Sequence, residues 1–376
     1  LHQDLQRQVR PHYGHQQHKM ILLAFDSFKG CLSAYEACRA AADAIATVMP
    51  KEEVRCLPMS DGGEGLVACA TRLLTLHPVT FDAHDPLMQP ITATYAISDD
   101  GTAVMEMAAT SGLTLIPPQH RDPLRATTYG VGEMLLHAYH HGAKRILMGI
   151  GGSATCDGGK GMIACLQDHN ALEALRHDLP ITVCCDVDNP LYGPRGAAYV
   201  FAPQKGATPA QVITLDRRLR DFARTTESLG LSPALAQRPG AGAAGGLGYG
   251  LAAYLDASLV SGIEALLSLA DFDNYAQQAT LIITGEGQSD RQTLMGKVAS
   301  GVLHHAMPLG VPVHLLSGSV ADTNALCAAG FASVRSINAG DTRSLTTLLR
   351  AEVATSNLAN SVVRLLHDLQ LTPHHV

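Results

Sequence analysis

Residues 20–36 read MILLAFDSFKGCLSAYE, and this stretch decides the fold of the chain. The apolar run over residues 20–25 is too short for a helix and predicts a buried strand. The next five residues, DSFKG, predict a loop. Ser33 and Glu36 have the spacing of a capping box, which predicts an Ala-rich helix that ends before Pro50. The chain therefore opens with a strand, a loop and a helix.

The same unit recurs at both ends of the chain. Residues 54–59 predict a second strand, which runs into the loop SDGGEG and another helix. From residue 281 strands and helices alternate again. Strands are expected at 281–284, at 313–316 and near Val334, and a last helix is expected to run to His367. Alternating strands and helices indicate parallel strands with right-handed crossovers.

The middle of the chain has a different pattern. Residues 91–97 and 102–107 alternate with period two around Asp100-Gly101, which predicts an antiparallel hairpin. Further strands are expected at 145–149, at 181–185 and near Tyr199. We predict an α/β protein of two domains, with a parallel-sheet domain over residues 20–80 and 276–376 and a mixed α/β domain with antiparallel strands inserted at 81–275. Residues 1–19 are polar and predict a disordered leader.

Composition excludes several classes of protein. Hydrophobic residues make up 46% of the chain and charged residues 16%, which is typical of a globular protein. The net charge of −7 argues against a nucleic-acid partner, and no apolar run approaches the roughly 18–20 residues that a membrane helix needs. Nine cysteines without a CxxC pair predict reduced thiols and a cytoplasmic protein.

Unusual loops follow the predicted strands. They are DSFKG, SDGGEG, TGEGQSD and SGS in the outer domain, and GGSATCDGG, DVDNP and PQKG in the insert. All of these loops except DVDNP contain Gly, and each carries an acid, a hydroxyl or a Lys. Glycine lets backbone N–H groups approach a phosphate, carboxylates hold Mg²⁺, and lysine neutralises phosphate charge. Because ligands bind at the carboxyl ends of strands, the loops predict a nucleotide-phosphate and Mg²⁺ site in the cleft between the domains.

Two glycine motifs resemble a dinucleotide fingerprint but lack its context. Residues 149–154 fit GxGxxA after a strand, yet no second strand ending in an acid follows about 20 residues on. Residues 240–245 fit GxGxxG, but no strand precedes them. A P-loop is also absent, because Gly159-Lys160 and Gly296-Lys297 lack the earlier Gly and the following hydroxyl. These patterns exclude NAD binding and a P-loop kinase.

Taken in order, the loops closely resemble the motifs of the class I glycerate kinase family. The shared motifs are DSFKGxLSAxEA, SDGGEG, GIGGSATxDGGxGM, CDVDNPLxGxxGAAxVFxPQKGA, PGAGAAGGLG and ITGEGxxDxQTLxGK, and they cover the chain from Met20 to about residue 365. The resemblance implies two α/β domains, one of them Rossmann-like and discontinuous. It also implies phosphorylation of D-glycerate with ATP and Mg²⁺, most often to 2-phosphoglycerate.

Other functions stay open at this point. The product could be 3-phosphoglycerate, the substrate could be another small hydroxy acid, and a binding protein without catalysis could retain the same cleft. The chain also departs from the family pattern. Cys156 and Lys160 stand where the family usually has Asn and Ala, and Gln288-Ser289 replace a usual Arg-Ile or Arg-Leu. The segment between Met162 and Asp186 is shorter than in the family by roughly two dozen residues.

The residues expected to carry the chemistry are taken from these loops. Asp186, which directly follows a predicted strand, is the candidate general base, and Lys29 is a second catalytic candidate. The residues expected to bind substrate or nucleotide are Ser27, Gly62, Gly63, Gly151, Gly152, Ser153, Thr155, Lys205, Glu286 and Lys297. The candidate Mg²⁺ ligands are Asp61, Glu64, Asp188 and Asp290.

Local structural roles compete with several of these assignments. Ser153 and Thr155 could cap the helix after Asp157, and Asp61 and Glu64 could complement a helix dipole. The Gly-rich stretch 242–248 is expected to allow close helix packing rather than to contact a ligand.

Overall fold

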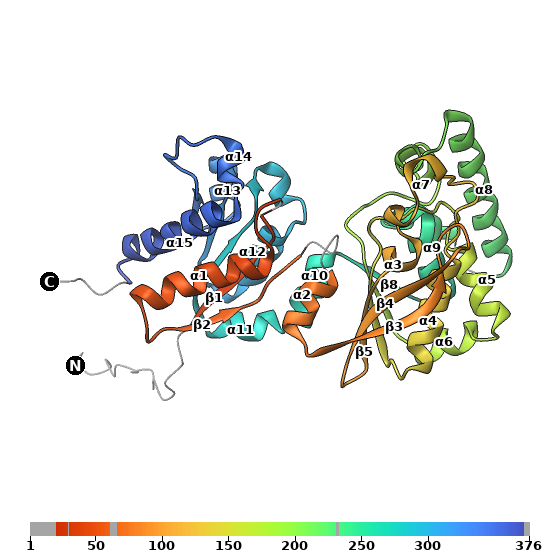
Figure 1. The fold of residues 1–376 in the computed structure, drawn as a ribbon, viewed down its shortest axis with the longest axis horizontal. Helices are drawn as coiled ribbons and strands as arrows, with labels where there is room; N and C mark the ends of the chain where they lie inside the picture. Colours follow the sequence, from red (N-terminus) through yellow and green to blue (C-terminus); the bar gives the residue numbers. More distant parts are fainter. Residues whose placement is uncertain (1–19, 29, 61–65, 231–232, 372–376) are drawn as a thin grey trace, which may run out of the picture.

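The computed structural model describes residues 20–28, 30–60, 66–230 and 233–371. Five residues of the predicted site, Lys29, Asp61, Gly62, Gly63 and Glu64, lie outside these ranges. The described chain forms two α/β domains, and both of its ends belong to the same domain (Figure 1).

The first domain contains a five-stranded sheet in the order β13-β11-β9-β1-β2, and every neighbouring pair is parallel. Its strands are β1 (Met20–Phe25), β2 (Glu53–Cys56), β9 (Ala279–Gly285), β11 (Val313–Ser317) and β13 (Ser333–Ser336). Successive residues of β1 point to opposite faces, as the pleat of a strand requires. Ile21, Leu23 and Phe25 pack with α1 (Ala34–Val48) and α15 (Ala351–Asp368). Leu22 and Ala24 join a core that includes α12 (Val298–Ala306).

The second domain contains a six-stranded sheet in the order β3-β4-β5-β6-β7-β8. The strands are β3 (Leu76–His84), β4 (Pro90–Ser98), β5 (Thr102–Glu106), β6 (Arg145–Gly149), β7 (Ile181–Cys184) and β8 (Ser258–Val260). β3, β4 and β5 pair antiparallel, whereas β5 to β8 pair parallel. The prediction of a mixed sheet with antiparallel strands is therefore confirmed.

Helices cover one face of this second sheet and enclose the largest core of the protein. They are α3 (Ala108–Ser111), α4 (Tyr129–His140), α5 (Lys160–Asp168), α6 (Leu172–Asp178), α7 (Ala197–Phe201), α8 (Pro209–Ser228) and α9 (Ala243–Tyr254). The remaining helices belong to the first domain or lie beside it: α2 (Leu66–Leu73), α10 (Gly262–Leu269), α11 (Phe272–Gln278), α13 (Thr323–Ala328) and α14 (Leu345–Leu348). A short two-stranded sheet joins β10 (Gln288–Ser289) to β12 (Ser319–Val320).

The helices α2 and α10 lie between the two sheets (Figure 1). Their apolar residues share one core with the inner face of the first sheet and with Ala96, Val104, Leu147 and Cys184 of the second. This continuous apolar core holds the two domains against each other. The expected domain boundary at residue 80 falls inside β3, and the whole of that strand pairs with β4 from Leu76 onward.

Most of the predicted elements form where the sequence pattern places them. The capping box at Ser33 is present, since its hydroxyl accepts the N–H of Glu36 and the Glu36 carboxylate accepts the N–H of Ser33. The second predicted strand is shorter than expected and ends at Cys56. Pro58, two residues further on, has no N–H to donate to a neighbouring strand.

The strand predicted near Tyr199 is wrong, because this segment is the helix α7. Its small residues Ala197 and Ala198 are both buried, as is Ala202 directly after it, whereas Tyr199 and Val200 are exposed. α7 packs against α8 and α9, so burial of an alanine face outweighs the strand preference of the Tyr-Val-Phe sequence.

Two further features concern the cysteines and the length of the helices. All nine cysteines are free thiols. Among the helices of the described residues, none combines the length and the apolar character needed to cross a membrane.

Candidate active site

A pocket of about 380 Å³ lies in the first domain, where β1, β9 and β11 end. It brings together the predicted binding residues Ser27, Glu286 and Lys297, which come from loops far apart in the sequence. Such convergence is expected, because the carboxyl ends of parallel strands meet at one edge of the sheet. The other lining residues are Asp26, Phe28, Cys31, Gly287, Gln288, Gly318, Ser319, Ile337, Asn338, Leu345, Leu348, Leu349 and Ala354.

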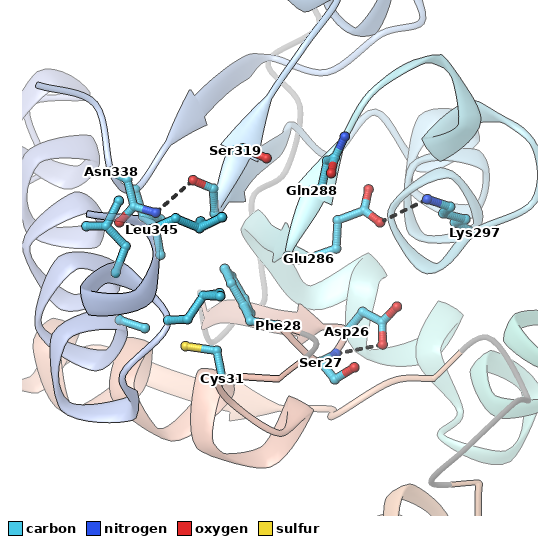
Figure 2. A pocket seen from close by; sticks show the side chains of 16 residues that line it. Asp26, Ser27, Phe28, Cys31, Glu286, Gln288, Lys297, Ser319, Asn338 and Leu345 are labelled. Atoms are coloured by element: carbon cyan, nitrogen blue, oxygen red, sulfur yellow. Dashed lines mark hydrogen bonds and ion pairs between the residues drawn. The ribbon is translucent and has the colours of Figure 1, made fainter. Parts of the chain in front are cut away.

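The Glu286 carboxylate is buried at this pocket and points toward Lys297 (Figure 2). One of its oxygens accepts hydrogen bonds from Ser289 Oγ at 2.9 Å and from Thr293 Oγ1 at 2.5 Å. The other oxygen lies 3.7 Å from Lys297 Nζ. Glu286 is thus a fixed carboxylate that positions the Lys297 ammonium at the pocket.

The same end of the pocket carries two more polar groups. Asp26 follows directly after β1, and one of its oxygens accepts the backbone N–H of Ser27 at 2.6 Å. Lys297 is the residue just before α12, at the end of that helix where backbone N–H groups lack intrahelical partners. A cation and a helix N-terminus together favour a negatively charged ligand such as a phosphate.

A second pocket, of about 470 Å³, lies in the other domain, where β6 and β7 end. It brings together five predicted residues, Gly151, Gly152, Ser153, Asp186 and Lys205. Its other lining residues are Leu113, Ile150, Cys184, Cys185, Val187, Phe201, Gln204, Ala243 and Ala244.

Lys205 is the most unusual group of the second pocket, because its side chain is charged and only 2% exposed. The ammonium donates hydrogen bonds to Ser153 Oγ at 2.6 Å and to the carbonyl oxygen of Thr155 at 2.7 Å. Within the described part of the chain it forms no ion pair with a carboxylate. Burial lowers the pKa of Lys205 to about 8. A buried charge without a counter-ion is costly, so this ammonium is suited to receive an anion.

Two buried side-chain atoms in the described residues have no hydrogen-bond partner, Thr155 Oγ1 and Arg121 Nε. Both residues adjoin Lys205. The carbonyl of Thr155 accepts the Lys205 ammonium, and a Cβ at Gly206 would lie 3.2 Å from the Cβ of Arg121. Unpaired buried polar atoms are rare in native proteins and call for a ligand, a water or a functional reason.

The Gly-rich stretch shapes the back of this pocket through close packing. Ala244, Gly245 and Gly246 have left-handed backbone conformations within α9. A Cβ at Gly245 would lie 2.0 Å from the carbonyl oxygen of Thr155, so only glycine allows the contact. Gly245 accepts the N–H of Gly158 at 3.0 Å. The stretch therefore fixes the backbone next to Lys205, in agreement with the predicted packing role.

Ser153 and Thr155 do not cap the following helix. α5 begins after Gly159, which gives no side-chain cap. Asp157 instead accepts the N–H groups of Gly159 and Gly161, both at 3.1 Å, and also bonds to Thr128. Ser153 thus faces Lys205, and Thr155 lies behind it.

The three other predicted acids of the described loops, besides Glu286, have separate partners. Asp186 lines the second pocket, and one of its oxygens accepts the N–H of Gly262, the first residue of α10, at 3.0 Å. Asp188 is exposed and forms an ion pair with Arg195 at 2.8 Å. Asp290 accepts the N–H of Gln292 at 2.7 Å and lines neither pocket.

The carboxylates of the described residues do not form a complete Mg²⁺ site by themselves. Phosphate oxygens of a nucleotide would have to supply further ligands. No group of three or more His, Cys, Asp or Glu residues with the geometry of a metal site occurs among them. Mg²⁺ in kinases is usually held by one or two carboxylates and by oxygens of the nucleotide. Asp26 and Glu286, the two carboxylates that line the first pocket, are compatible with that mode of binding.

Sequence reasoning missed several residues of the two pockets. Asp26 stands in the DSFKG loop beside Ser27 and could have been found from the same signal. Arg195, which pairs with Asp188, and Arg121, which adjoins Gly206, line neither pocket and were not predicted either. The apolar side of the first pocket, formed by Leu345, Leu348 and Leu349, was not predicted, because none of the loop motifs includes these residues.

Comparison with known proteins places the chain in a family. The profile of the Glycerate kinase family matches residues 21–170 and 167–367. The chain is 41% identical over 346 residues to a protein of Bacillus subtilis named glycerate kinase, covering 85% of this chain and 90% of that protein. It is 40% identical over 331 residues to a glycerate 2-kinase of Escherichia coli, covering 80% and 86%. The crystal structure of a glycerate kinase 2 from Salmonella typhimurium LT2 superposes with a TM-score of 0.81 at 35% identity, covering 94% and 98%.

Proposed function

The chain belongs to the glycerate kinase family, and from this premise we propose that it transfers the γ-phosphoryl group of ATP to the 2-hydroxyl of D-glycerate, giving 2-phosphoglycerate. The product and the use of ATP are parts of this proposal, as are the domain limits 20–80, 276–376 and 81–275. We also propose a cytoplasmic location, which agrees with nine free thiols.

One observation carries the choice of an acid substrate. The second pocket holds the buried Lys205 ammonium, which has no carboxylate partner among the described residues, and also the carboxylate of Asp186. A hydroxy acid needs these two groups, since its carboxylate pairs with a cation and its hydroxyl must give up a proton. We assign Lys205 to the carboxylate of glycerate, with Ser153 and the 151–152 backbone beside it.

Asp186 serves as the general base in this proposal. A hydroxyl is a poor nucleophile until its proton has an acceptor, and an adjacent carboxylate is sufficient, as in the catalytic loops of other kinases. The backbone of β7 and the hydrogen bond from Gly262 hold Asp186 in place. The glycerate hydroxyl would lie next to this carboxylate.

The nucleotide occupies the first pocket, with its phosphates at the end that carries Lys297. Glu286 orients Lys297, and Ser27 and Asp26 lie on the same side. When bound with ATP, Mg²⁺ neutralises charge on the phosphate oxygens. Asp26 and Glu286 are the described carboxylates that would hold it. The candidate ligands Asp61 and Glu64 and the catalytic candidate Lys29 remain proposals from the sequence. Asp188, which pairs with Arg195, and Asp290, which accepts the N–H of Gln292, also remain proposals.

Phosphoryl transfer requires ATP and glycerate to come into contact. Each of the two pockets, however, is lined by residues of one domain alone. We therefore infer that the domains close over ATP and glycerate, which also removes water from the phosphoryl group. Phosphoryl transfer then depends mainly on positioning and on charge neutralisation.

The test is ADP release in a coupled assay with D-glycerate, ATP and Mg²⁺. We expect glycerate-dependent turnover by the natural protein. Asp186→Asn, which keeps the shape but removes the proton acceptor, should lower kcat by about 10²- to 10⁴-fold. Asp43→Asn, at an exposed position of α1, is the matched control and should leave kcat unchanged.

Different results would identify the alternatives. Binding of ATP and glycerate without turnover would indicate a non-catalytic binding protein. Turnover with tartronate or L-glycerate in place of D-glycerate would identify another hydroxy acid kinase, and carbon NMR of the product distinguishes the 2-phosphate from the 3-phosphate. If Asp186→Asn abolished ATP binding but kept kcat at saturation, Asp186 would be a metal ligand and the base would lie elsewhere.

A further inference from the structure

The pocket of the first domain has two chemically different ends (Figure 2). Asp26, Ser27, Glu286 and Lys297 gather at one end. Leu345 lies at the other end, beyond the ring of Phe28. The pocket therefore changes from charged to apolar along its length.

The apolar end contains leucine side chains that solvent reaches. Leu345 is 71% exposed and Leu349 is 45% exposed, and both line the pocket together with Phe28 and Ile337. Single exposed leucines are ordinary on a protein surface. Leu345 is the first residue of α14 and Leu349 follows its last, and both line the same pocket as the buried Phe28, so an apolar ligand placed there would cover both at once.

Hydrogen bonds hold the segment that carries Leu345 and Leu349, here called the leucine wall, against the rest of the domain. Asn338 Nδ2 donates to the carbonyl of Gly318 at 2.9 Å, and Asn338 Oδ1 accepts from Asn357 of α15 at 2.7 Å. Asp341 pairs with Arg343, whose guanidinium also bonds to Asn357 at 3.2 Å. Ser344 caps the short helix α14 that carries Leu345. These hydrogen bonds fix the position of the leucine wall at the pocket.

We propose that the apolar end of this pocket binds the base of ATP, between Phe28 and the leucines Leu345 and Leu349. The assignment rests on the proposed kinase function and specifies where its nucleotide lies. A nucleotide has a flat apolar base at one end and anionic phosphates at the other, which is the order of groups along this pocket. The volume of about 380 Å³ lies within the range of about 300–1,000 Å³ that is typical of small-molecule sites.

The test compares ADP binding by Leu345→Ser and Leu349→Ser with binding by the natural protein, using isothermal titration calorimetry. We expect the Kd for ADP to rise by about 5- to 10-fold in each variant, because each serine removes apolar surface that the base would cover. Inorganic tripolyphosphate, which has no base, should bind all three proteins with the same Kd. Ile213→Ser, at a 61% exposed position of α8 in the other domain, is the matched control and should bind ADP normally.

The outcomes separate this inference from the proposed function. An ADP Kd within twofold of the natural value in both variants would place the base elsewhere, even if the natural protein phosphorylates glycerate. If the natural protein binds ADP but does not phosphorylate glycerate, the kinase proposal fails, and the variants still decide where the base binds. A change in oligomeric state with normal ADP binding would make the leucine wall a contact between copies and overturn the inference.

Discussion

Replacing Lys205 with methionine tests whether the buried ammonium binds the acid substrate. Methionine has a similar length but no charge, so Lys205→Met removes the cation without opening a large cavity. The lost interaction is a charge-assisted hydrogen bond to a carboxylate, worth about 1.5–3 kcal/mol. We therefore expect kcat/KM for D-glycerate to fall by about 10- to 150-fold. The KM for ATP should not change, because the nucleotide pocket lies in the other domain.

The same variant should remain folded. Burial lowers the pKa of Lys205 from 10.5 to about 8, which corresponds to about 3 kcal/mol against holding the charge in this site. Methionine relieves that cost. Against it, Ser153 Oγ and the Thr155 carbonyl lose their donor, at about 1–3 kcal/mol for each buried polar group left unpaired. The gain and the loss are of similar size, so Tm should shift by only a few degrees.

The assay is coupled ADP release at varied glycerate and saturating ATP, together with a thermal melt of each protein. Lys51→Met, at an exposed lysine, is the control and should match the natural protein in both measurements. A folded Lys205→Met protein whose kcat/KM for glycerate falls less than threefold would refute the assignment, because the ammonium would then have no part in binding the acid.

Two further predictions concern pH. Since burial lowers the pKa of Lys205 to about 8 and only the protonated form attracts a carboxylate, kcat/KM for glycerate should decline as the pH rises above about 8; a flat profile to pH 9.5 would contradict this role. His305 bonds to Glu264 at 2.9 Å and to Asp273 at 2.7 Å, and although burial opposes its charge, the two carboxylates raise its pKa above the usual value of roughly 6.5. The protonated His305 therefore stabilises the fold fully below about pH 6.5, and this contribution is lost as the pH rises through the raised pKa. Urea unfolding should show that His305→Gln lowers the free energy of unfolding most at pH 6 and least at pH 9, and the reverse trend would rule out this ion pair.

Local sequence signals were sufficient for much of the fold. The strand β1, the capping box of α1 and the hairpin of β4 and β5 depend on residues close together in the sequence, and each forms as predicted. α7 was misread because its conformation depends on packing against α8 and α9. The strand β3 had no clear signal either. It contains Pro78 and lies at the edge of its sheet, where pairing with β4 on one side is enough.

The candidate site could be predicted as a set of loops but not as a set of contacts. The rule that parallel strands end at one edge explains why Ser27, Glu286 and Lys297 share a pocket. No local pattern could reveal that Lys205 donates to Ser153 and Thr155 and has no carboxylate partner in the described chain. Such facts depend on side chains brought together over long sequence separations.

The helix α10 connects the two pockets physically and limits how the domains can close. Its first N–H binds Asp186 of the pocket in the second domain, which we propose for glycerate. Its next residue, Ile263, packs on α12, which follows Lys297 of the pocket that we propose for the nucleotide. A Cβ at Gly301 of α12 would lie only 2.6 Å from Ile263 Cγ1, so the two helices are in close contact and have little room to approach further. We infer that the proposed closing rotation pivots near this contact and brings the open rims of the two pockets, and with them the two reactants, toward each other.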